Sequence, residues 1–240
     1  DTDRSRGLGD VYKRQVHIHI IDAELMGKGE KEKKDLYIEG VQNNGIINHY
    51  EYIINSEGTI EIRHVLKPEG KMPLWFPRIG LTLTVSDALD QVKWYGRGPQ
   101  ENYPDRKTGY PMGIYASTVQ AMYEPYLMPQ DYGLRTDVRW LQLTTDKGIG
   151  LQFKMNEWFN FNIYPYSTDN LTKAMYTYQL QKQKGMTLNL DYATTGVGCT
   201  ARGVFGAYKA MPQEYRRTIS IRPMTVSYTH LRAHETDQYL

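Results

Sequence analysis

Several features that would point to a particular class of protein are scarce in this sequence. Its 240 residues include one cysteine, Cys199, so an internal disulfide is excluded, and a cytoplasmic location is favoured over a periplasmic one. The 29 basic residues nearly balance the 27 acidic ones, so we expect no nucleic-acid partner. No apolar run reaches the roughly 20 residues that cross a bilayer, so we expect no membrane partner.

The motifs of several catalytic classes are also missing. There is no Gly-x-Ser-x-Gly, and Gly196-Val197-Gly198 is not followed by Gly-Lys-Ser, so neither a hydrolase elbow nor a phosphate loop is predicted. Cys199 has no histidine nearby in sequence and is more simply a small buried or edge thiol. His17 and His19 share one face of an expected strand, but without a third ligand nearby we predict no metal site.

Tyrosine, by contrast, is abundant. The chain holds 20 tyrosines and four tryptophans against five phenylalanines. Such rings suit half-buried strands, and they also stack on sugars. For any single tyrosine the strand is the simpler explanation, and contact with a sugar remains open.

Alternating apolar and polar residues predict short strands along most of the chain. Asn43-Asn44-Gly45 and Asp146-Lys147-Gly148 predict hairpin turns, and Ser167-Thr168-Asp169 predicts the capped start of a short helix. Long amphipathic helices and internal repeats are absent. We therefore predict one all-β domain, built as a large antiparallel sandwich or barrel. The expected strands cover residues 16–21, 36–41, 46–54, 59–66, 74–85, 92–95, 141–145, 150–155, 158–164, 187–192 and 215–221.

The two ends of the chain carry related hexapeptides. Asp10-Val11-Tyr12-Lys13-Arg14-Gln15 and Val226-Ser227-Tyr228-Thr229-His230-Leu231 can be encoded by one DNA element read in opposite directions. That element resembles the transposase end sequence used to prepare sequencing libraries. We therefore expect residues 1–15 and 226–240 to be translated adapter, and residues 16–225 to form the domain. Native homologous sequence running through either junction in the source genome would contradict this.

Two polar loops hold carboxylates that could act in catalysis. Glycoside hydrolysis needs a pair of carboxyl groups at a suitable separation, and four acidic residues in these loops could converge. Four arginines lie beside them, which favours structural ion pairs with lowered carboxyl pKa values. The acidic residues are Glu101, Asp105, Asp131 and Asp137, and the arginines are Arg97, Arg106, Arg135 and Arg139. We predict a structural role for Glu101, Asn102, Asp105, Arg106, Arg135 and Asp137.

Several motifs in these loops and strands stand together in a familiar order. They are residues 74–80 (LWFPRIG), 98–106 (GPQENYPDR), 123–140 (YEPY and PQDYGLRTDVRW), 161–171, 188–192 (LNLDY) and 196–198. Together they resemble the C-terminal domain of the β-galactosidases of glycoside hydrolase family 2, over roughly residues 45–222.

The resemblance implies a β super-sandwich like that of galactose mutarotase, in a parent enzyme that is a retaining β-galactosidase. It places the two catalytic glutamates and the magnesium ligands in a preceding TIM barrel. It therefore implies no catalytic residue, metal or cofactor in this chain, and Mg and Na in the parent. The implied partners are a galactoside substrate and the parent's own N-terminal and barrel domains, in a homo-oligomer.

The sequence departs from the family pattern at three places. Members with an aromatic platform carry a Trp shortly after the Gly-x-Gly, whereas the aligned position here is near Gly203. Arg202, Gly203 and Phe205 are therefore the candidate substrate contacts, with a plain loop as the simpler alternative. Tyr176-Thr177-Tyr178 replaces a His-x-His, and Gln130-Asp131-Tyr132-Gly133 replaces Gln-Glu-Asn-Gly.

Two other functions stay open at this point. One is a free-standing carbohydrate-binding β-sandwich, with tyrosines and tryptophans forming its site. The other is an aldose 1-epimerase, which needs a histidine and a glutamate that converge. His49 and His64 are its candidates in the core region, and both fit strands.

Overall fold

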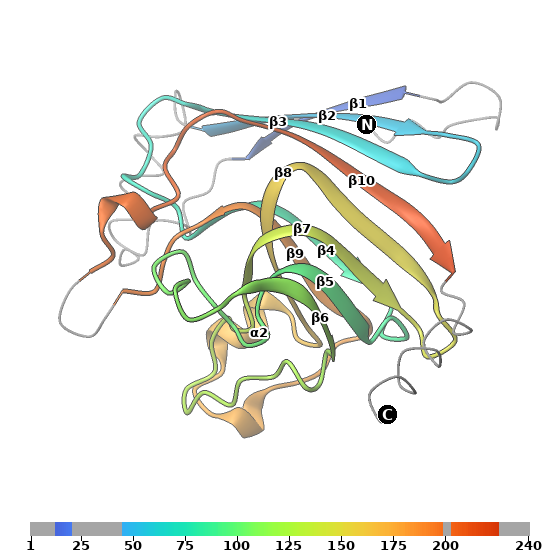
Figure 1. Ribbon diagram of the computed structural model, residues 1–240. Helices are drawn as coiled ribbons and strands as arrows, with labels where there is room; N and C mark the ends of the chain where they lie inside the picture. Colours follow the sequence, from blue (N-terminus) through green and yellow to red (C-terminus); the bar gives the residue numbers. More distant parts are fainter. Residues whose placement is uncertain (1–12, 21–44, 199–202, 226–240) are drawn as a thin grey trace.

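The computed structural model describes residues 13–20, 45–198 and 203–225 (Figure 1). No helix in these ranges is long and apolar enough to cross a membrane. The described residues form ten strands, one short α-helix and two 3-10 turns. They are β1 (Lys13–Ile20), β2 (Gly45–Ile54), β3 (Ile60–Glu69), β4 (Arg78–Val85), β5 (Gln91–Arg97), β6 (Met112–Thr118), β7 (Arg135–Thr144), β8 (Ile149–Tyr164), α2 (Thr168–Lys173), η2 (Thr177–Gln179), β9 (Met186–Thr194), η3 (Gly206–Tyr208) and β10 (Tyr215–Thr225).

All strand pairs are antiparallel, in the order β1-β2-β3-β10-β8-β7-β5-β6, with β9 paired to β8 and β4 paired to β9. The strand β8 joins these parts. Its first half pairs with β10, its second half pairs with β9, and β7 lies along both halves. Figure 1 shows β1, β2, β3 and β10 as one layer above the remaining strands. The predicted all-β antiparallel super-sandwich is confirmed.

Much of the core is built by alternation of side chains along the strands. In β5, Val92 and Trp94 are buried while Lys93 between them is exposed. The Trp94 ring meets Phe161 of β8 edge to face, with 5.9 Å between the ring centroids. Burying side chains of this size contributes about 1.5–3 kcal/mol each, so this period-two pattern fixes which face of each strand points inward.

The strand β9 differs because both of its faces are buried. Leu188 and Leu190 point into the apolar core, whereas Thr187, Asn189 and Asp191 alternate with them on the other face. A buried row of polar side chains requires hydrogen-bond partners, and these come from β4, β8 and the loop before β7. This polar row is therefore part of a network, described below.

Some of the strand predictions are wrong, and one falls on residues that the structure does not describe. Residues 150–155 and 158–164 form one strand, because Asn156 does not break the sheet and instead accepts a hydrogen bond from Thr218 N of β10 (3.0 Å). The edge strand β6 was not predicted, since its sequence, MGIYAST, contains a glycine and does not alternate between apolar and polar residues. Residues 36–41 lie outside the described ranges, and β2 pairs with β1 and β3 on its two edges.

Two other expectations concern the helix and the ends of the chain. The predicted short helix is confirmed, because the Ser167 side chain caps α2 by accepting a hydrogen bond from Asn170 N (3.0 Å). The strand β1 runs across the junction expected after Gln15. The adapter segments and the boundaries at residues 15 and 226 stay predictions.

Candidate functional site

Glu101 lies in the first polar loop and is held by three donors. Its carboxylate accepts hydrogen bonds from the Tyr103 hydroxyl (3.1 Å), the Tyr126 hydroxyl and the backbone N–H of Gly133 (2.8 Å). These donors come from the same loop and from the connection between β6 and β7. Glu101 thereby ties these two loops together.

Asn102 and Arg135 connect the same loops through backbone groups. The Asn102 side-chain oxygen accepts from Thr136 N (3.0 Å) and the Thr136 hydroxyl (2.5 Å), and its backbone N–H donates to Leu134 O (2.8 Å). The Arg135 guanidinium donates to the carbonyls of Pro99 and Gly133, both at 2.9 Å. Because Asn102, Arg135 and Thr136 are buried, each of these bonds satisfies a group that water does not reach.

Asp137 carries the ion pairs of this region. Its carboxylate lies 2.6 Å from Arg97 Nε and 2.5 Å from Lys107 Nζ. Burial opposes the charged form, but the hydrogen bonds from Lys107 and Arg97 hold the pKa of Asp137 below its ordinary value. Its φ of 57° places the residue in the left-handed region, at an irregular point in the β7–β8 pairing.

The arginines do not all pair with carboxylates, contrary to the sequence-based expectation. Arg97 pairs with Asp137, whereas Arg106 donates to Gly198 O (2.8 Å) and Arg135 donates to the carbonyls named above. The Arg139 guanidinium instead packs over the Trp158 ring, 3.8 Å from its centroid. Position in sequence did not reveal that backbone carbonyls and a ring would serve as partners.

Asp105 fixes the start of the loop that carries the predicted substrate contacts. Its carboxylate accepts hydrogen bonds from Val197 N (3.1 Å) and Gly198 N (2.7 Å), and Arg106 adds its bond to Gly198 O. A Cβ on Gly196 would lie 2.4 Å from the Asp105 carboxyl carbon, so glycine is required for this approach. The first polar loop thus positions the loop of residues 196–206.

Of the predicted substrate contacts, two can be located. Gly203 is exposed, and a Cβ added there would meet no atom within 4 Å, while the Phe205 side chain is 66% exposed. Arg202 lies outside the described residues. Sequence reasoning missed Trp75, which lies beside this loop. Its neighbour Phe76 donates a backbone hydrogen bond to Ala210 O (2.8 Å), and Lys209 Nζ lies 5.5 Å from the Trp75 ring centroid.

These segments expose several large apolar side chains at one end of the molecule. They belong to the segment before β4 and to the two sides of the loop of residues 196–206, which backbone hydrogen bonds hold together. The loop-end surface consists of Leu74, Trp75, Val197, Phe205, Tyr208 and Met211. Exposed apolar residues gathered in this way mark a contact surface.

A second polar region lies on the face of β4, β9 and β8 that points away from the apolar core. Arg78 lies at its centre, with Nη2 3.1 Å from an Asp191 carboxylate oxygen and 3.2 Å from an Asp131 carboxylate oxygen. Asn189 donates to Asn162 (2.8 Å) and to the Tyr164 hydroxyl (3.0 Å). We call this network the polar face; its members are Arg78, Thr82, Asp131, Asn162, Tyr164, Asn189 and Asp191.

Asp191 is the most unusual carboxyl group of the polar face. It is 1% exposed, and burial raises its pKa to about 7 although Arg78 favours its charged form. A raised pKa suits a general acid, but a proton donor must also reach its substrate. Asp191 is enclosed and ion-paired, so it does not meet that requirement.

Next to the polar face, a cavity of about 250 Å³ opens between the loop before β7 and the helix α2. Its walls are Pro129, Gln130, Asp131, Tyr164, Thr168, Leu171 and Thr172. Asp131 is the charged residue among them, and its side chain is 45% exposed. The cavity therefore combines one accessible carboxylate with hydroxyl groups and apolar carbon.

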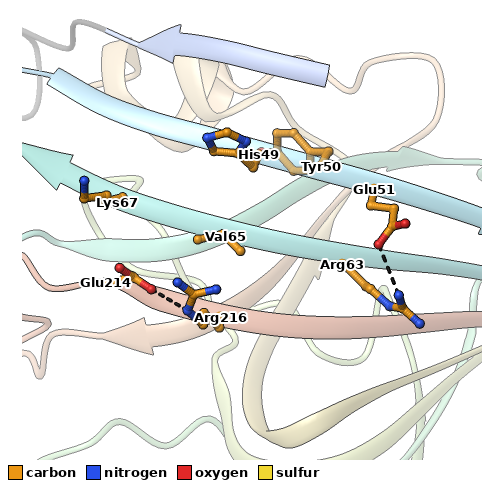
Figure 2. Close-up of a pocket in the computed structure, with 8 residues that line it drawn as sticks. All are labelled: His49, Tyr50, Glu51, Arg63, Val65, Lys67, Glu214 and Arg216. Carbon is orange, nitrogen blue, oxygen red and sulfur yellow. Dashed lines mark hydrogen bonds and ion pairs between the residues drawn. The ribbon is translucent and has the colours of Figure 1, made fainter. Parts of the chain in front are cut away.

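A groove of about 450 Å³ crosses the outer face of β2, β3 and β10 (Figure 2). Each basic residue of the groove is paired: Arg63 Nη1 lies 3.1 Å from Glu51, and Arg216 pairs with Glu214. Lys67 Nζ lies 3.2 Å from Glu69, which is not part of the lining. Balanced surface pairs of this kind give no net charge that would attract an ionic ligand.

Neither His64 nor the possible metal ligands form a site in the part of the chain that the structure describes, and His49 lies in the wall of the groove just described (Figure 2). His64 is buried, with its ring nitrogens 2.6 Å from the Tyr192 hydroxyl and 2.8 Å from Asn48 Oδ1, so it does not meet a glutamate as an epimerase requires. Within the described ranges, no group of three or more His, Cys, Asp or Glu side chains could hold a metal ion.

Comparison with known proteins finds relatives that are named beta-galactosidase. The model of the family described as "Beta galactosidase small chain" matches residues 5–221. A beta-galactosidase from Priestia megaterium (strain DSM 319 / IMG 1521) is 38% identical over 147 residues, covering 61% of this chain and 14% of the relative. One from Vibrio vulnificus (strain YJ016) is 32% identical over 242 aligned residues, covering 92% of this chain and 23% of the relative.

Among solved structures, the GalM/aldose epimerase homologue from C. elegans is similar, with a TM-score of 0.44 and 11% identity. The similarity covers 90% of this chain and 66% of that one. The chain spans less than a quarter of the length of the two curated relatives named above. Since the family match extends over most of the chain, the chain belongs to the beta-galactosidase small-chain family.

Proposed function

We propose that this chain is the C-terminal domain of a retaining β-galactosidase of glycoside hydrolase family 2, which hydrolyses terminal β-D-galactosides. In this proposal the domain frames the entrance of the active site, and the two catalytic glutamates belong to a TIM barrel elsewhere in the parent enzyme. The observation that carries the proposal is the family match over residues 5–221, in relatives that are four or more times longer.

The engagement of the loop carboxylates supports a non-catalytic role for this chain. A retaining glycosidase needs one carboxylate free to attack the sugar and one protonated carboxyl group beside it, about 5–5.5 Å apart. Glu101, Asp105 and Asp137 each accept two or more hydrogen bonds from fixed donors. Such bonds hold the side chain in place, which suits anchoring rather than attack.

The loop-end surface supports the position proposed for the domain. Its apolar side chains are exposed here, and an interface with another domain of the parent would bury them. Trp75 and Phe205 would then stand near the entrance, together with Arg202 and Gly203 as substrate contacts. The Mg and Na ions of the proposed enzyme would be held by the parent, and its homo-oligomeric assembly is part of the same proposal.

Complementation tests the proposed function. The 240-residue chain is expressed alone and together with the Priestia megaterium relative from which the matching segment has been deleted, and hydrolysis of a nitrophenyl β-galactoside is measured. We expect no turnover by the chain alone and restored turnover by the pair. Turnover by the chain alone that disappears in Glu101→Gln or Asp131→Asn would contradict the proposal.

Variants of the loop-end surface give the matched control. Trp75→Ala and Phe205→Ala are expected to weaken complementation, because they remove apolar contact area. Ile149→Ala removes a side chain that is 59% exposed, similar to Phe205, from the start of β8 and should leave complementation unchanged. Equal effects of all three variants would count against the proposed orientation.

One observation favours the second candidate, a free-standing carbohydrate-binding module. The rings of Tyr176 and Tyr178 stack with 5.5 Å between centroids and 7° between planes, yet the residues are 57% and 79% exposed. Exposed parallel rings can receive the apolar face of a sugar. A free-standing module would not restore turnover to the shortened relative, so the same complementation assay separates the two functions.

A further inference from the structure

We propose that the cavity between Pro129, Asp131 and α2 is a binding site for a single uncharged sugar ring, whose hydroxyl groups donate to the Asp131 carboxylate. The sugar as ligand class rests on the proposed function, whereas the location of the site rests on the geometry of the cavity. The site is separate from the loop-end surface, because its walls come from the loop before β7, the end of β8 and the helix α2.

Asp131 is fixed in place and still has capacity to accept hydrogen bonds. One carboxylate oxygen accepts from Asn162 Nδ2 (2.9 Å), and the other lies 3.2 Å from Arg78 Nη2. A carboxylate offers about four lone-pair directions, so these two contacts leave part of it available. With 45% of the side chain exposed, the remaining directions are open to a ligand.

The charges around the cavity select against ionic ligands of either sign. A metal cation at Asp131 would have to approach the Arg78 guanidinium, which already pairs with that carboxylate. An anion would meet the Asp131 carboxylate itself. A neutral ligand with hydroxyl donors avoids both repulsions, and hydrogen bonds to a charged acceptor are the strong kind.

The size and the walls of the cavity suit one small ring. Its volume of about 250 Å³ lies below the roughly 300–1,000 Å³ of sites that hold drug-sized ligands. Thr168 and Thr172 are exposed and contribute hydroxyl groups, whereas Pro129 and Leu171 are buried parts of the wall. The accessible wall is therefore chiefly polar, which matches the hydroxyl groups of a pyranose ring.

The tyrosine in the wall is a neutral hydroxyl group. Burial, aided by the Asp131 charge, raises the pKa of Tyr164 to about 12, so its hydroxyl keeps its proton at neutral pH. The same hydroxyl accepts a hydrogen bond from Asn189 Nδ2 (3.0 Å), which fixes its position. Because Tyr164 is fully buried, it backs the site as an uncharged part of the wall.

The helix α2 is held in place without a ligand. Ser167 caps its start, and the Asn170 side chain accepts from Gln181 N (2.8 Å) and donates to Gln179 O (3.2 Å). Three of its residues, Thr168, Leu171 and Thr172, face the cavity at helical spacing. The wall is thus preorganised, and binding would not have to order it.

Titration of the ¹⁵N-labelled 240-residue chain with D-galactose, followed by NMR, tests the site. We expect saturable shift changes that centre on Asp131, Thr168 and Thr172. D-galacturonate has the same ring with a carboxylate attached, and this carboxylate would be repelled by Asp131. We therefore expect it to bind at least about tenfold more weakly, a loss of the size of one hydrogen bond to a charged group. Saturable changes centred on Tyr176 and Tyr178, or no saturable change with galactose, would overturn the site.

Two neighbouring residues of α2 provide a matched pair of variants. Thr172→Trp places a large side chain in the cavity and should abolish galactose binding. Lys173→Trp makes a similar change one residue further along, at a side chain that is 74% exposed and does not line the cavity, and should leave binding unchanged. Galactose binding that survives Thr172→Trp would contradict the proposal.

Asp131→Asn tests the carboxylate itself and is expected to weaken binding about tenfold, the loss of one charge-assisted hydrogen bond. Because this change also removes a partner of Arg78, the Thr172→Trp result stands independently if the asparagine variant is unstable.

Complementation distinguishes this site from the proposed function. If Thr172→Trp retains complementation while the original chain binds no galactose, the site fails and the proposed function stands.

Discussion

Asp105 and Gly196 approach each other so closely that a side chain cannot be added to the glycine. A Cβ at residue 196 would lie 2.4 Å from the Asp105 carboxyl carbon and 2.5 Å from one of its oxygens. The approach aligns that carboxylate with the next two backbone N–H groups along the chain. The pair therefore sets where the loop of residues 196–206 leaves the sheet.

Gly196→Ala is expected to displace the Asp105 carboxylate and to break its bonds to Val197 N and Gly198 N. Losing hydrogen bonds to a charged group costs about 1.5–3 kcal/mol each, so unfolding in urea should show a loss of at least that size. Gly206→Ala is the matched control, since a Cβ there meets nothing within 4 Å. Equal stability of the two variants would contradict the role given to Asp105.

Asn102→Ala is expected to destabilise the loops at the start of β7. The change leaves Thr136 N and the Thr136 hydroxyl without their common acceptor inside the protein, at a cost of about 1–3 kcal/mol. Urea unfolding measures the loss, with the exposed neighbour Gln100→Ala as the control. A loss no greater than that of the control would show that water replaces the missing acceptor.

The pH dependence of stability should reveal Asp191. Its folded pKa of about 7 lies above the value of about 3.9 in an unfolded chain, so its contribution is present at low pH and is lost as the pH rises towards 7. Compared with Asp191→Asn, the original chain should lose up to about 1.4 kcal/mol per pH unit within that window. Parallel curves for the two proteins between pH 5 and 7 would contradict the raised pKa.

His64 should behave in the opposite sense. Burial lowers its pKa to about 4, below the value of about 6.5 in an unfolded chain. Its contribution to stability is complete above about pH 6.5 and is lost as the pH falls towards 4, because only the unfolded chain gains the proton. Side-chain ¹⁵N shifts of His64 should remain those of a neutral imidazole at pH 5, and a midpoint near 6.5 would contradict this.

Much of the fold followed from local sequence patterns. Period-two alternation located most strands, and Ser167 located the start of α2, because both signals depend on neighbours in sequence. The pattern divided β8 at Asn156 and Glu157, since polar residues there resemble a turn. Only pairing with β10 shows that the strand continues, and that partner lies some 60 residues away along the chain.

The candidate sites were harder to predict. Arg106 and Arg135 find backbone carbonyls, which carry no side-chain signal in a sequence. The polar face joins Arg78 to residues more than 50 and more than 80 positions away, so no local motif contains it. Trp75 reaches the loop of residues 196–206 through the pairing of Phe76 with Ala210, which also depends on the tertiary fold.

The strand β8 has a consequence for how the protein comes apart. Its first half is bonded into the layer that contains β10 and its second half into the part that contains β9, with no interruption between them. Fraying that starts on either side must therefore pass through the same continuous backbone. We expect the two layers to lose their structure in one cooperative transition, with neither persisting alone.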